Sequence, residues 1–414
     1  GKSELLQSWI LSMALHYHPH DVVFVIIDYK GGGMANLLVE LPHVVGKITN
    51  IGSNIGRSLI SLQSEMKIRQ RIFDQYQEYQ VNHIDKYQKL YRDGKVNEPL
   101  PHLIIVADEF AELKTNEPEF MAGLISAARI GRSLGVHLVL ATQKPTGVVD
   151  EQIQSNSKFR LCLKVQNAGD SREMIRRPDA ARITQPGRCY VLVGEEEVVE
   201  LFQSYWSGAP YTGEAQVAQD SGNQVRIVGL TGERSKPLQK ERTTVKSDMD
   251  ELTAIRRYLR KVAEENGIRK LDGPWLPELP EMASLADLPD FGKGELMGGF
   301  DGSGWNRTLP WLRIPVGIYD APALQAQGIQ YLDLATEGHY GIYGAPATGK
   351  TTLLKTILWA LGCHYSPADV NIYILDCGGW SMNVLAGMPH VGGVALDCEE
   401  EKFQKLGQML TEEM

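Results

Sequence analysis

The sequence predicts an α/β fold in which a mostly parallel sheet is covered by helices on both faces, and it predicts that this arrangement occurs in tandem. Short runs of β-branched residues alternate with stretches of helical periodicity, as in sheets buried on both faces. A second observation is a glycine-rich loop placed before a helical stretch at residues 344–351. The third is an internal repeat, because the start of the chain recurs near its end.

The elements follow from their periodicity. Residues 3–17 carry apolar side chains at helical spacing, and Pro19 ends that helix. The continuous apolar run 22–27 predicts a buried parallel strand. The remaining predictions of the first module are a long polar helix over 58–91, a strand over 103–107, a helix over 119–133 capped by Gly135, and strands over 138–141, 159–165 and 189–193.

The chain divides into three predicted parts. Residues 1–206 form a first module and residues 336–414 the start of a second, joined by a connecting segment over 207–335. The connecting segment contains a predicted helix over 248–266. Its three tryptophans, Trp275, Trp305 and Trp311, predict that it packs on the modules and is not a free tether.

The repeat has an offset of 348 residues. Gly1-Lys2-Ser3 aligns with Gly349-Lys350-Thr351, and 11 of the first 28 paired positions are identical. After one deletion, residues 41–44 match residues 388–391. Two unrelated units of similar composition are a much weaker explanation. We therefore expect one nearly whole module and the first part of another.

Composition excludes several classes of protein. Hydrophobic residues make up 43% of the chain and charged residues 22%, as in soluble globular proteins. No apolar run approaches the roughly 20 residues needed to span a bilayer. The net charge of −9 gives no global basic footprint for nucleic acid, and the five scattered cysteines form no CxxC pair. The first residues lack an initiator Met and the last stand within an amphipathic stretch, so we expect a fragment of a longer protein.

The motif at residues 344–351 carries the strongest chemical signal. It fits G-x-x-x-x-G-K-[ST], with a strand-like run over 340–343 before it and a helix-like run over 352–361 after it. Backbone N–H groups of such a loop point at phosphate oxygens, the lysine neutralises them, and the following hydroxyl binds Mg²⁺. The predicted nucleotide-binding residues are Gly344, Ala345, Pro346, Ala347, Thr348, Gly349, Lys350, Thr351 and Thr352, with Thr351 also a magnesium ligand. A glycine-rich turn with an exposed lysine is the alternative.

Gly1, Lys2 and Ser3 match the end of the same motif. The tripeptide alone is too common to be informative, but the repeat aligns Lys2 with Lys350. We therefore expect the first module to bind a nucleotide as well, with Ser3 as a magnesium ligand.

Polar groups follow two buried strands of the first module. Asp108 and Glu109 end the run 103–107, where ligands bind in parallel sheets. Asp108 is predicted to hold Mg²⁺ through water and Glu109 to polarise the attacking water. Gln143, after the run 138–141, is predicted to lie beside Glu109 and to sense the γ-phosphate. A solvated strand end and an ordinary strand-end amide remain the alternatives. At the end of the first strand, Asp28-Tyr29-Lys30 and three glycines permit close backbone approach or form a flexible turn.

These motifs resemble those of the FtsK/SpoIIIE family of hexameric motor ATPases. The similar segments are residues 28–33, 106–113 and 137–145. The tandem arrangement, with residues 202–210, 314–320 and 338–344, resembles the ATPases of bacterial type VII secretion, EssC and EccC. The resemblance implies tandem RecA/FtsK-like P-loop NTPase modules that use ATP and Mg²⁺. This chain would be the second of three modules and part of the third, in the cytoplasmic part of a protein anchored in the bacterial membrane.

The resemblance also implies partners and a cargo. These are small helical-hairpin proteins of the WXG100 (ESAT-6-like) class, other membrane components of the secretion system, and further copies in a homo-hexamer, with DNA not expected. Arg160 and Arg172 stand where the family places arginines that act on a neighbour's nucleotide, although each could be a surface ion-pair partner. The second repeat departs from the pattern, because the lysine of Asp28-Tyr29-Lys30 has no counterpart in residues 376–380. By the 348-residue offset, counterparts of Asp108 and Glu109 would fall beyond residue 414.

Two other functions stay open at this stage. One is a DNA translocase of the same superfamily, which the charge of −9 disfavours. The other is a scaffold that binds ATP tightly, turns over rarely, and is stabilised by the bound nucleotide.

Overall fold

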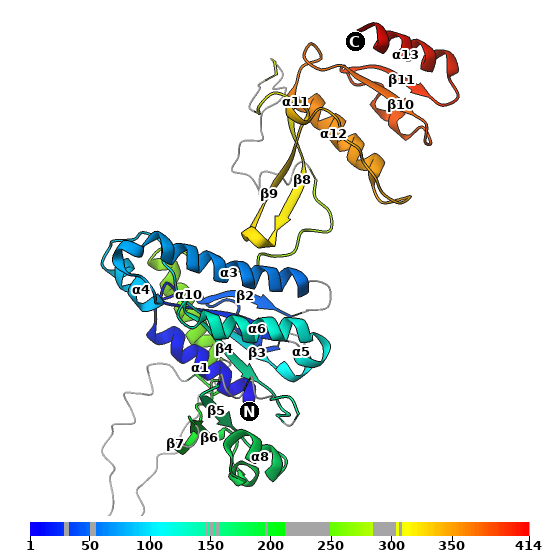
Figure 1. Ribbon diagram of the computed structural model, residues 1–414. Coiled ribbons are helices and arrows are strands. Elements are labelled where there is room, and N and C mark those ends of the chain that lie inside the picture. Colours follow the sequence, from blue (N-terminus) through cyan, green and yellow to red (C-terminus); the bar gives the residue numbers. More distant parts are fainter. Residues whose placement is uncertain are drawn as a thin grey trace, which may run out of the picture. The chain divides into compact units, whose positions relative to one another are not determined.

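The computed structural model divides the chain into two compact units (Figure 1). Unit 1 comprises Gly1–Leu276 with Pro322–Gln325, and unit 2 comprises Pro277–Ala321 with Ala326–Met414. The structure describes residues 1–28, 33–49, 55–145, 147–149, 153, 157–194, 198–211, 249–284, 304–305 and 309–413.

Unit 1 is built on a parallel sheet of four strands in the order β2-β1-β3-β4. Its strands are β1 (Val22–Asp28), β2 (Val44–Ile48), β3 (His102–Asp108) and β4 (Val136–Ala141). Asp28 of β1 pairs with Asp108 of β3, and Asp108 with Ala141 of β4. The carboxyl ends of three strands therefore meet at one edge of the sheet.

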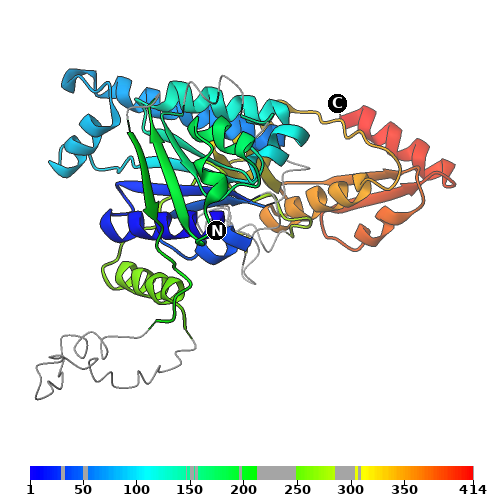
Figure 2. The ribbon, with the colours of Figure 1, turned by 90° about the horizontal axis from the view of Figure 1, so that it is seen from below.

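The predicted two-sided burial of this sheet is confirmed at β1. Val23, Val25 and Ile27 pack in one hydrophobic cluster with residues of α3, α5 and α6. Their neighbours Val22, Phe24 and Ile26 pack in a second cluster with residues of α1, α2 and α10. Because alternate side chains of a strand point to opposite faces, an unbroken apolar run fits a strand covered twice. Figures 1 and 2 show helices on both sides of the sheet.

The helices largely follow the predicted periodicity. One prediction was wrong: residues 58–91 do not form one helix, because Gln80 adopts a left-handed conformation and the side chain of His83 caps a new helix start. The helical elements of unit 1 are α1 (Lys2–His16), α2 (Gly33–Leu38), α3 (Ile55–Gln75), η1 (Gln77–Tyr79), α4 (Ile84–Arg92), α5 (Phe110–Asn116), α6 (Pro118–Gly131), α8 (Ala168–Ile175), η2 (Asp179–Arg182), α10 (Glu251–Glu265) and η4 (Pro322–Leu324).

A second sheet follows β4, and the strands predicted over 159–165 and 189–193 belong to it and not to the parallel sheet. β5 (Phe159–Cys162), β6 (Arg188–Val193) and β7 (Val198–Gln203) pair antiparallel in chain order. Cys162 and Leu192 pack with Ile175 of α8 and with Ala180 and Ile183. Only four residues separate the end of β6 from the start of β7, whereas a parallel return needs a crossover of a dozen residues or more.

Unit 2 begins with an antiparallel hairpin, β8 (Arg313–Ala321) and β9 (Ala326–Asp333), which periodicity did not predict. Short helix α11 (Leu334–Glu337) precedes the loop of residues 344–349. The strand predicted at 340–343 is absent among the described residues, because this segment pairs with no other strand. The rest of the unit is α12 (Lys350–His364), parallel strands β10 (Ile372–Asp376) and β11 (Val391–Leu396), η5 (Ser381–Leu385) and α13 (Glu400–Glu413).

The tryptophans of the connecting segment pack as predicted. Trp275 packs on the first cluster of unit 1, and its Nε1–H donates to the Ser58 carbonyl at 2.9 Å. In unit 2, Trp305 meets the ring of His390 edge to face, and Trp311 meets Tyr365 in the same way. Within the described residues, no helix is both long and apolar enough to cross a membrane.

The sequence repeat recurs as identical contacts in the two units. His43 Nε2 lies 2.8 Å from the Tyr17 carbonyl, and the repeat-related His390 Nε2 lies 2.7 Å from the Tyr365 carbonyl. Both imidazoles are 2% exposed. Each histidine therefore ties the start of one strand, β2 or β11, to the end of the helix that opens its repeat, α1 or α12.

Candidate nucleotide-binding and catalytic site

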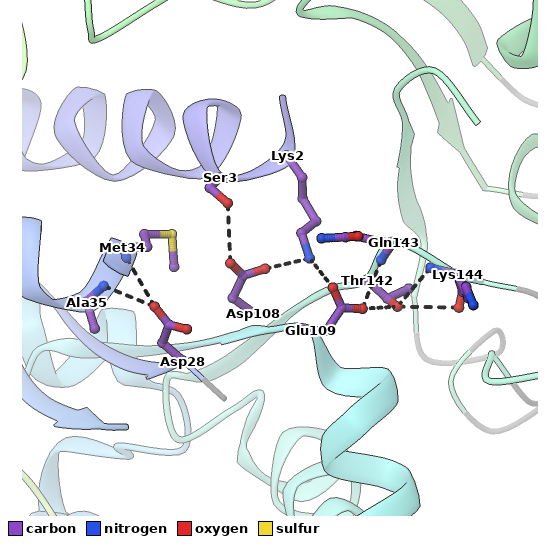
Figure 3. Close-up of polar contacts among 10 residues, drawn as sticks. All are labelled: Lys2, Ser3, Asp28, Met34, Ala35, Asp108, Glu109, Thr142, Gln143 and Lys144. Atoms are coloured by element: carbon purple, nitrogen blue, oxygen red, sulfur yellow. Dashed lines mark hydrogen bonds and ion pairs between the residues drawn. The ribbon is translucent and has the colours of Figure 1, made fainter. Parts of the chain in front are cut away.

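Four polar residues meet at the carboxyl edge of the unit 1 sheet (Figure 3). Lys2 Nζ lies 2.7 Å from Asp108 Oδ1 and 3.1 Å from Glu109 Oε2. Ser3 Oγ donates to Asp108 Oδ2 at 3.4 Å. The fold thus brings Lys2 and Ser3 together with Asp108 and Glu109, from which they are separated by 105 to 107 positions in the sequence.

The fold places each member of the cluster. Lys2 and Ser3 open α1, so the unpaired N–H groups and positive dipole end of that helix lie at the same edge. Asp108 ends β3, whose preceding residues are buried. The side chains of Asp108 and Glu109 are only 13% and 5% exposed. Two such carboxylates side by side are costly unless a cation meets them, and Lys2 supplies that charge.

Glu109 has an unusual backbone. Its φ of 58° and ψ of 50° lie in the left-handed region, which a residue with a Cβ rarely adopts. Its Oε1 accepts hydrogen bonds from Thr142 Oγ1 at 2.9 Å and from the backbone N–H of Gln143 at 3.0 Å. Strained backbone at a buried, charged position is typical of functional sites.

The donor set suits Mg²⁺. The Ser3 hydroxyl and the Asp108 carboxylate are oxygen donors, which this ion prefers, and they lie within hydrogen-bonding distance of each other. Among the residues described, no group of three or more His, Cys, Asp or Glu side chains is arranged to hold a metal. A magnesium ion here would therefore be held by these two residues together with phosphate and water, as is usual for this ion.

Asp28 has a structural part that the sequence did not reveal. Its buried Oδ2 accepts the backbone N–H of Met34 at 3.1 Å and so fixes the start of α2. The repeat-related Asp376 accepts the N–H of Met382 at 3.0 Å and of Gly378 at 3.0 Å. These two hydrogen bonds lower the pKa of the Asp376 carboxyl, and the bond from Met382 has the larger effect. Lys30 and its neighbours 29–32 lie outside the described residues.

The loop of unit 2 is folded around its own lysine. Lys350 Nζ donates to the carbonyls of Gly344 and Ala345, each at 2.7 Å. Gly349 has a φ of 93°, which favours glycine, and a Cβ on Gly344 would come within 2.6 Å of Thr348 Oγ1, so a larger residue there would displace that hydroxyl. The tight loop therefore directs the lysine side chain back over the turn.

The remaining predicted residues of this loop lie around the start of α12. Thr351 is exposed in its first turn, and Thr352 lies on the wall of a pocket of about 370 Å³ lined also by Val316, Trp359 and Leu385. Residues Ala345, Pro346 and Ala347 form the exposed crown of the loop.

The candidate trans-acting arginines belong to the antiparallel part of unit 1. Arg160 lies in β5, with its Nε donating to the Ser157 carbonyl at 3.4 Å, and Arg172 is exposed on α8. Gln143 does lie beside Glu109 but reaches it through its backbone N–H. Sequence reasoning missed Thr142, and its position at the end of the strand next to β3 is the signal that could have found it.

A protein-family model matches two segments of this chain. The FtsK/SpoIIIE family model matches residues 1–147 and 318–414, which is more than half of the chain. The chain belongs to the FtsK/SpoIIIE family. The matched residues include Lys2, Asp108 and Glu109 in the first segment and Lys350 in the second. The predicted resemblance and the predicted fold class are therefore confirmed.

Curated relatives narrow the likeness. The chain is 45% identical over 424 aligned residues to the ESX secretion system protein EccC of Geobacillus thermodenitrificans, and 42% identical over 421 residues to the type VII secretion system protein EssC of Staphylococcus aureus. Each alignment covers 100% of this chain and 27% or 28% of the relative. The chain thus spans about a quarter of the length of these relatives.

Solved structures share the fold. The cytoplasmic domain of the type VII secretion ATPase EccC of Thermomonospora curvata matches with a TM-score of 0.77 and 29% identity, covering 97% of this chain and 42% of that one. EssC ATPases 2 and 3 of Geobacillus thermodenitrificans match with a TM-score of 0.69 and 20% identity, covering 100% of this chain and 66% of the other.

Proposed function

We propose that this chain is the part of a type VII secretion ATPase that couples ATP binding and hydrolysis to the recognition and export of small helical-hairpin proteins. The observation that carries the proposal is the convergence of Lys2 and Ser3, at a helix start, with Asp108 and Glu109, at a strand end. The family and the named relatives supply the biological setting.

We assign each polar residue of the unit 1 site a role in ATP binding or hydrolysis. Lys2 and the N–H groups at the start of α1 bind the phosphates of ATP, which compete with the two carboxylates for the ammonium group. Ser3 and Asp108 hold Mg²⁺, which neutralises charge on the phosphates. Glu109 accepts the proton of the attacking water. The side chain of Gln143 senses the γ-phosphate, and Arg160 or Arg172 acts on the nucleotide of a neighbouring copy.

Unit 2 contributes a second nucleotide site. Its residues Gly349, Lys350 and Thr351 correspond in the repeat to Gly1, Lys2 and Ser3. The parent protein is anchored in the bacterial membrane, assembles as a homo-hexamer with other secretion components, and presents these units in the cytoplasm. Support for a peptide cargo comes from a neighbour in structure, the Thermomonospora curvata EccC ATPases 2 and 3, which was solved in complex with a signal sequence peptide.

A Glu109→Gln substitution in the parent protein tests the proposal. We expect ATP turnover by this module to fall at least about 100-fold, because a general base is lost, while nucleotide affinity changes little. Export of a WXG100-type protein into the culture medium should fall with it. The measurements are steady-state ATP hydrolysis, equilibrium nucleotide binding and immunoblotting of the medium.

Glu119→Gln is the matched control, because Glu119 is exposed near the start of α6. Undiminished export by the Glu109→Gln protein would contradict a motor role and favour the nucleotide-stabilised scaffold. Saturable binding of duplex DNA at near-physiological salt, without binding of a WXG100 tail peptide, would favour a DNA translocase.

A further inference from the structure

Glu109 is held by residues of the neighbouring strand end, and its two carboxylate oxygens face different partners. Oε1 accepts the Thr142 hydroxyl at 2.9 Å and the Gln143 N–H at 3.0 Å, whereas Oε2 lies 3.1 Å from Lys2 Nζ (Figure 3). One oxygen is thus tied to the end of β4, and the other faces the lysine that opens α1. Carboxylates fixed at one oxygen present the other in a defined direction.

The Thr142 hydroxyl has one hydrogen and two acceptors within reach. Glu109 Oε1 lies at 2.9 Å and the Lys144 carbonyl at 3.3 Å, while the Lys144 N–H donates to the hydroxyl oxygen at 3.2 Å. The nearer acceptor is charged, so it makes the stronger hydrogen bond. Because the Lys144 carbonyl is a second acceptor, the hydroxyl can release Glu109 and still keep a hydrogen-bond partner.

The left-handed backbone of Glu109 needs such support. A residue with a Cβ at φ 58° persists only when its surroundings hold it there. The two hydrogen bonds from the β4 end and the contact with Lys2 come from three separate positions in the sequence. Loss of one of them should loosen the carboxylate more than it loosens the fold.

We infer that Thr142 is a positioning residue that fixes Oε1 of Glu109 and leaves Oε2 to act as the base. The inference rests on the proposed hydrolytic function of this site. It attributes the orientation of the Glu109 carboxylate to Thr142, a residue outside the nucleotide-binding motifs. Thr142 acts only through Glu109 in this inference and is not itself a catalytic residue.

Kinetics of Thr142→Val and Thr142→Ser in the parent protein, in which Glu109→Gln is also measured, test the inference. Valine keeps the shape but removes the hydroxyl, so we expect kcat to fall about tenfold while KM for ATP stays within about twofold. Serine keeps the hydroxyl and should retain near wild-type kcat.

A second measurement does not depend on turnover. Thr142→Val should lower the melting temperature of unit 1 by about 2–4 °C in the wild-type background and by less than about 1 °C in a Glu109→Ala background, since the hydrogen bond is then already gone. Equal losses in the two backgrounds would mean that Thr142 does not act through Glu109, and would overturn the inference.

The outcomes separate this inference from the proposed function. Loss of turnover in Glu109→Gln together with wild-type kcat in Thr142→Val would overturn the positioning role alone. Wild-type turnover in Glu109→Gln would overturn the proposed function, and the positioning role with it. Loss of turnover in Glu109→Gln, together with a tenfold loss in Thr142→Val but not in Thr142→Ser and with coupled melting temperatures, would support both.

Discussion

The two lysines of the repeat stand in the same sequence context but have different partners. Lys2 is paired with the carboxylates of Asp108 and Glu109 and is 18% exposed. Lys350 donates to the carbonyls of Gly344 and Ala345 in an exposed loop. The helix start is set locally in both units, whereas the charge that meets the lysine comes from a strand about a hundred residues further along the chain.

Two other pairs of repeat-related contacts agree between the units. The bonds from His43 to Tyr17 and from His390 to Tyr365 agree within 0.1 Å, as do those from Met34 to Asp28 and from Met382 to Asp376. These contacts join residues at most 26 positions apart. The comparison teaches that the repeat preserves its short-range contacts, and that the electrostatics of the site depend on long-range ones.

The largest expected difference is in the stability of the two units after loss of their lysines. Lys2→Met should lower the free energy of unfolding of unit 1 by about 2 kcal/mol, because two nearly buried carboxylates lose their cation. Lys350→Met should cost less than about 0.5 kcal/mol, since its bonds lie in an exposed loop. Calorimetric unfolding without nucleotide measures both. Equal losses would show that the carboxylates of unit 1 do not depend on Lys2.

We expect a fall in pH to lower the free energy of unfolding of unit 1. Burial lowers the pKa of His137 to about 4, with the neighbouring His102 adding to the shift, and burial also lowers the pKa of His102 and His43. The unfolded histidines take up protons near pH 6.5, whereas the folded ones resist until lower pH. This contribution to stability is therefore complete above about pH 6.5 and is lost as the pH falls toward 4.

The measurement is the melting temperature of the chain between pH 7.5 and 4.5, with His137→Gln as the control. His137 Nε2 and His102 Nδ1 lie 2.9 Å apart, so protonation of both would bring two N–H groups together. His137→Gln removes the largest of these shifts and should flatten the acid slope. An unchanged slope in that variant would assign the pH dependence to other groups.

The smallest expected difference between the two units is the loss of stability when Asp28 or its counterpart Asp376 is replaced. Asp28→Asn and Asp376→Asn should each cost about 1 kcal/mol, because each weakens a charge-assisted bond that fixes the start of the next helical element. Chemical denaturation followed separately for each unit would compare them. A difference of more than about 1 kcal/mol between the two variants would break the structural equivalence of the repeat.

The α/β class, the main parallel strands and the residues of the candidate site could be predicted from the amino-acid sequence. The continuous run 22–27 is unbroken because both faces of β1 are buried, so composition alone identifies it. Lys2 and Ser3 were predicted because phosphate-binding loops require glycine, lysine and hydroxyl residues at fixed spacing, and Asp108 and Glu109 because they follow a buried strand. The helix split at Gln80, the antiparallel pairing of β5–β7 and the hairpin β8–β9 were not predicted, since periodicity does not specify which strand pairs with which.

The hydrogen-bond and ion-pair partners of the site residues could be identified only in the folded structure. Sequence placed Gln143 near Glu109 but could not show that its backbone N–H, together with the Thr142 hydroxyl, makes the contact. It gave Asp28 a place beside a glycine-rich segment, whereas the fold uses its carboxylate to cap α2. Hydrogen-bond partners between residues far apart in the chain depend on strand order and register, and these are set by the packing of the whole sheet.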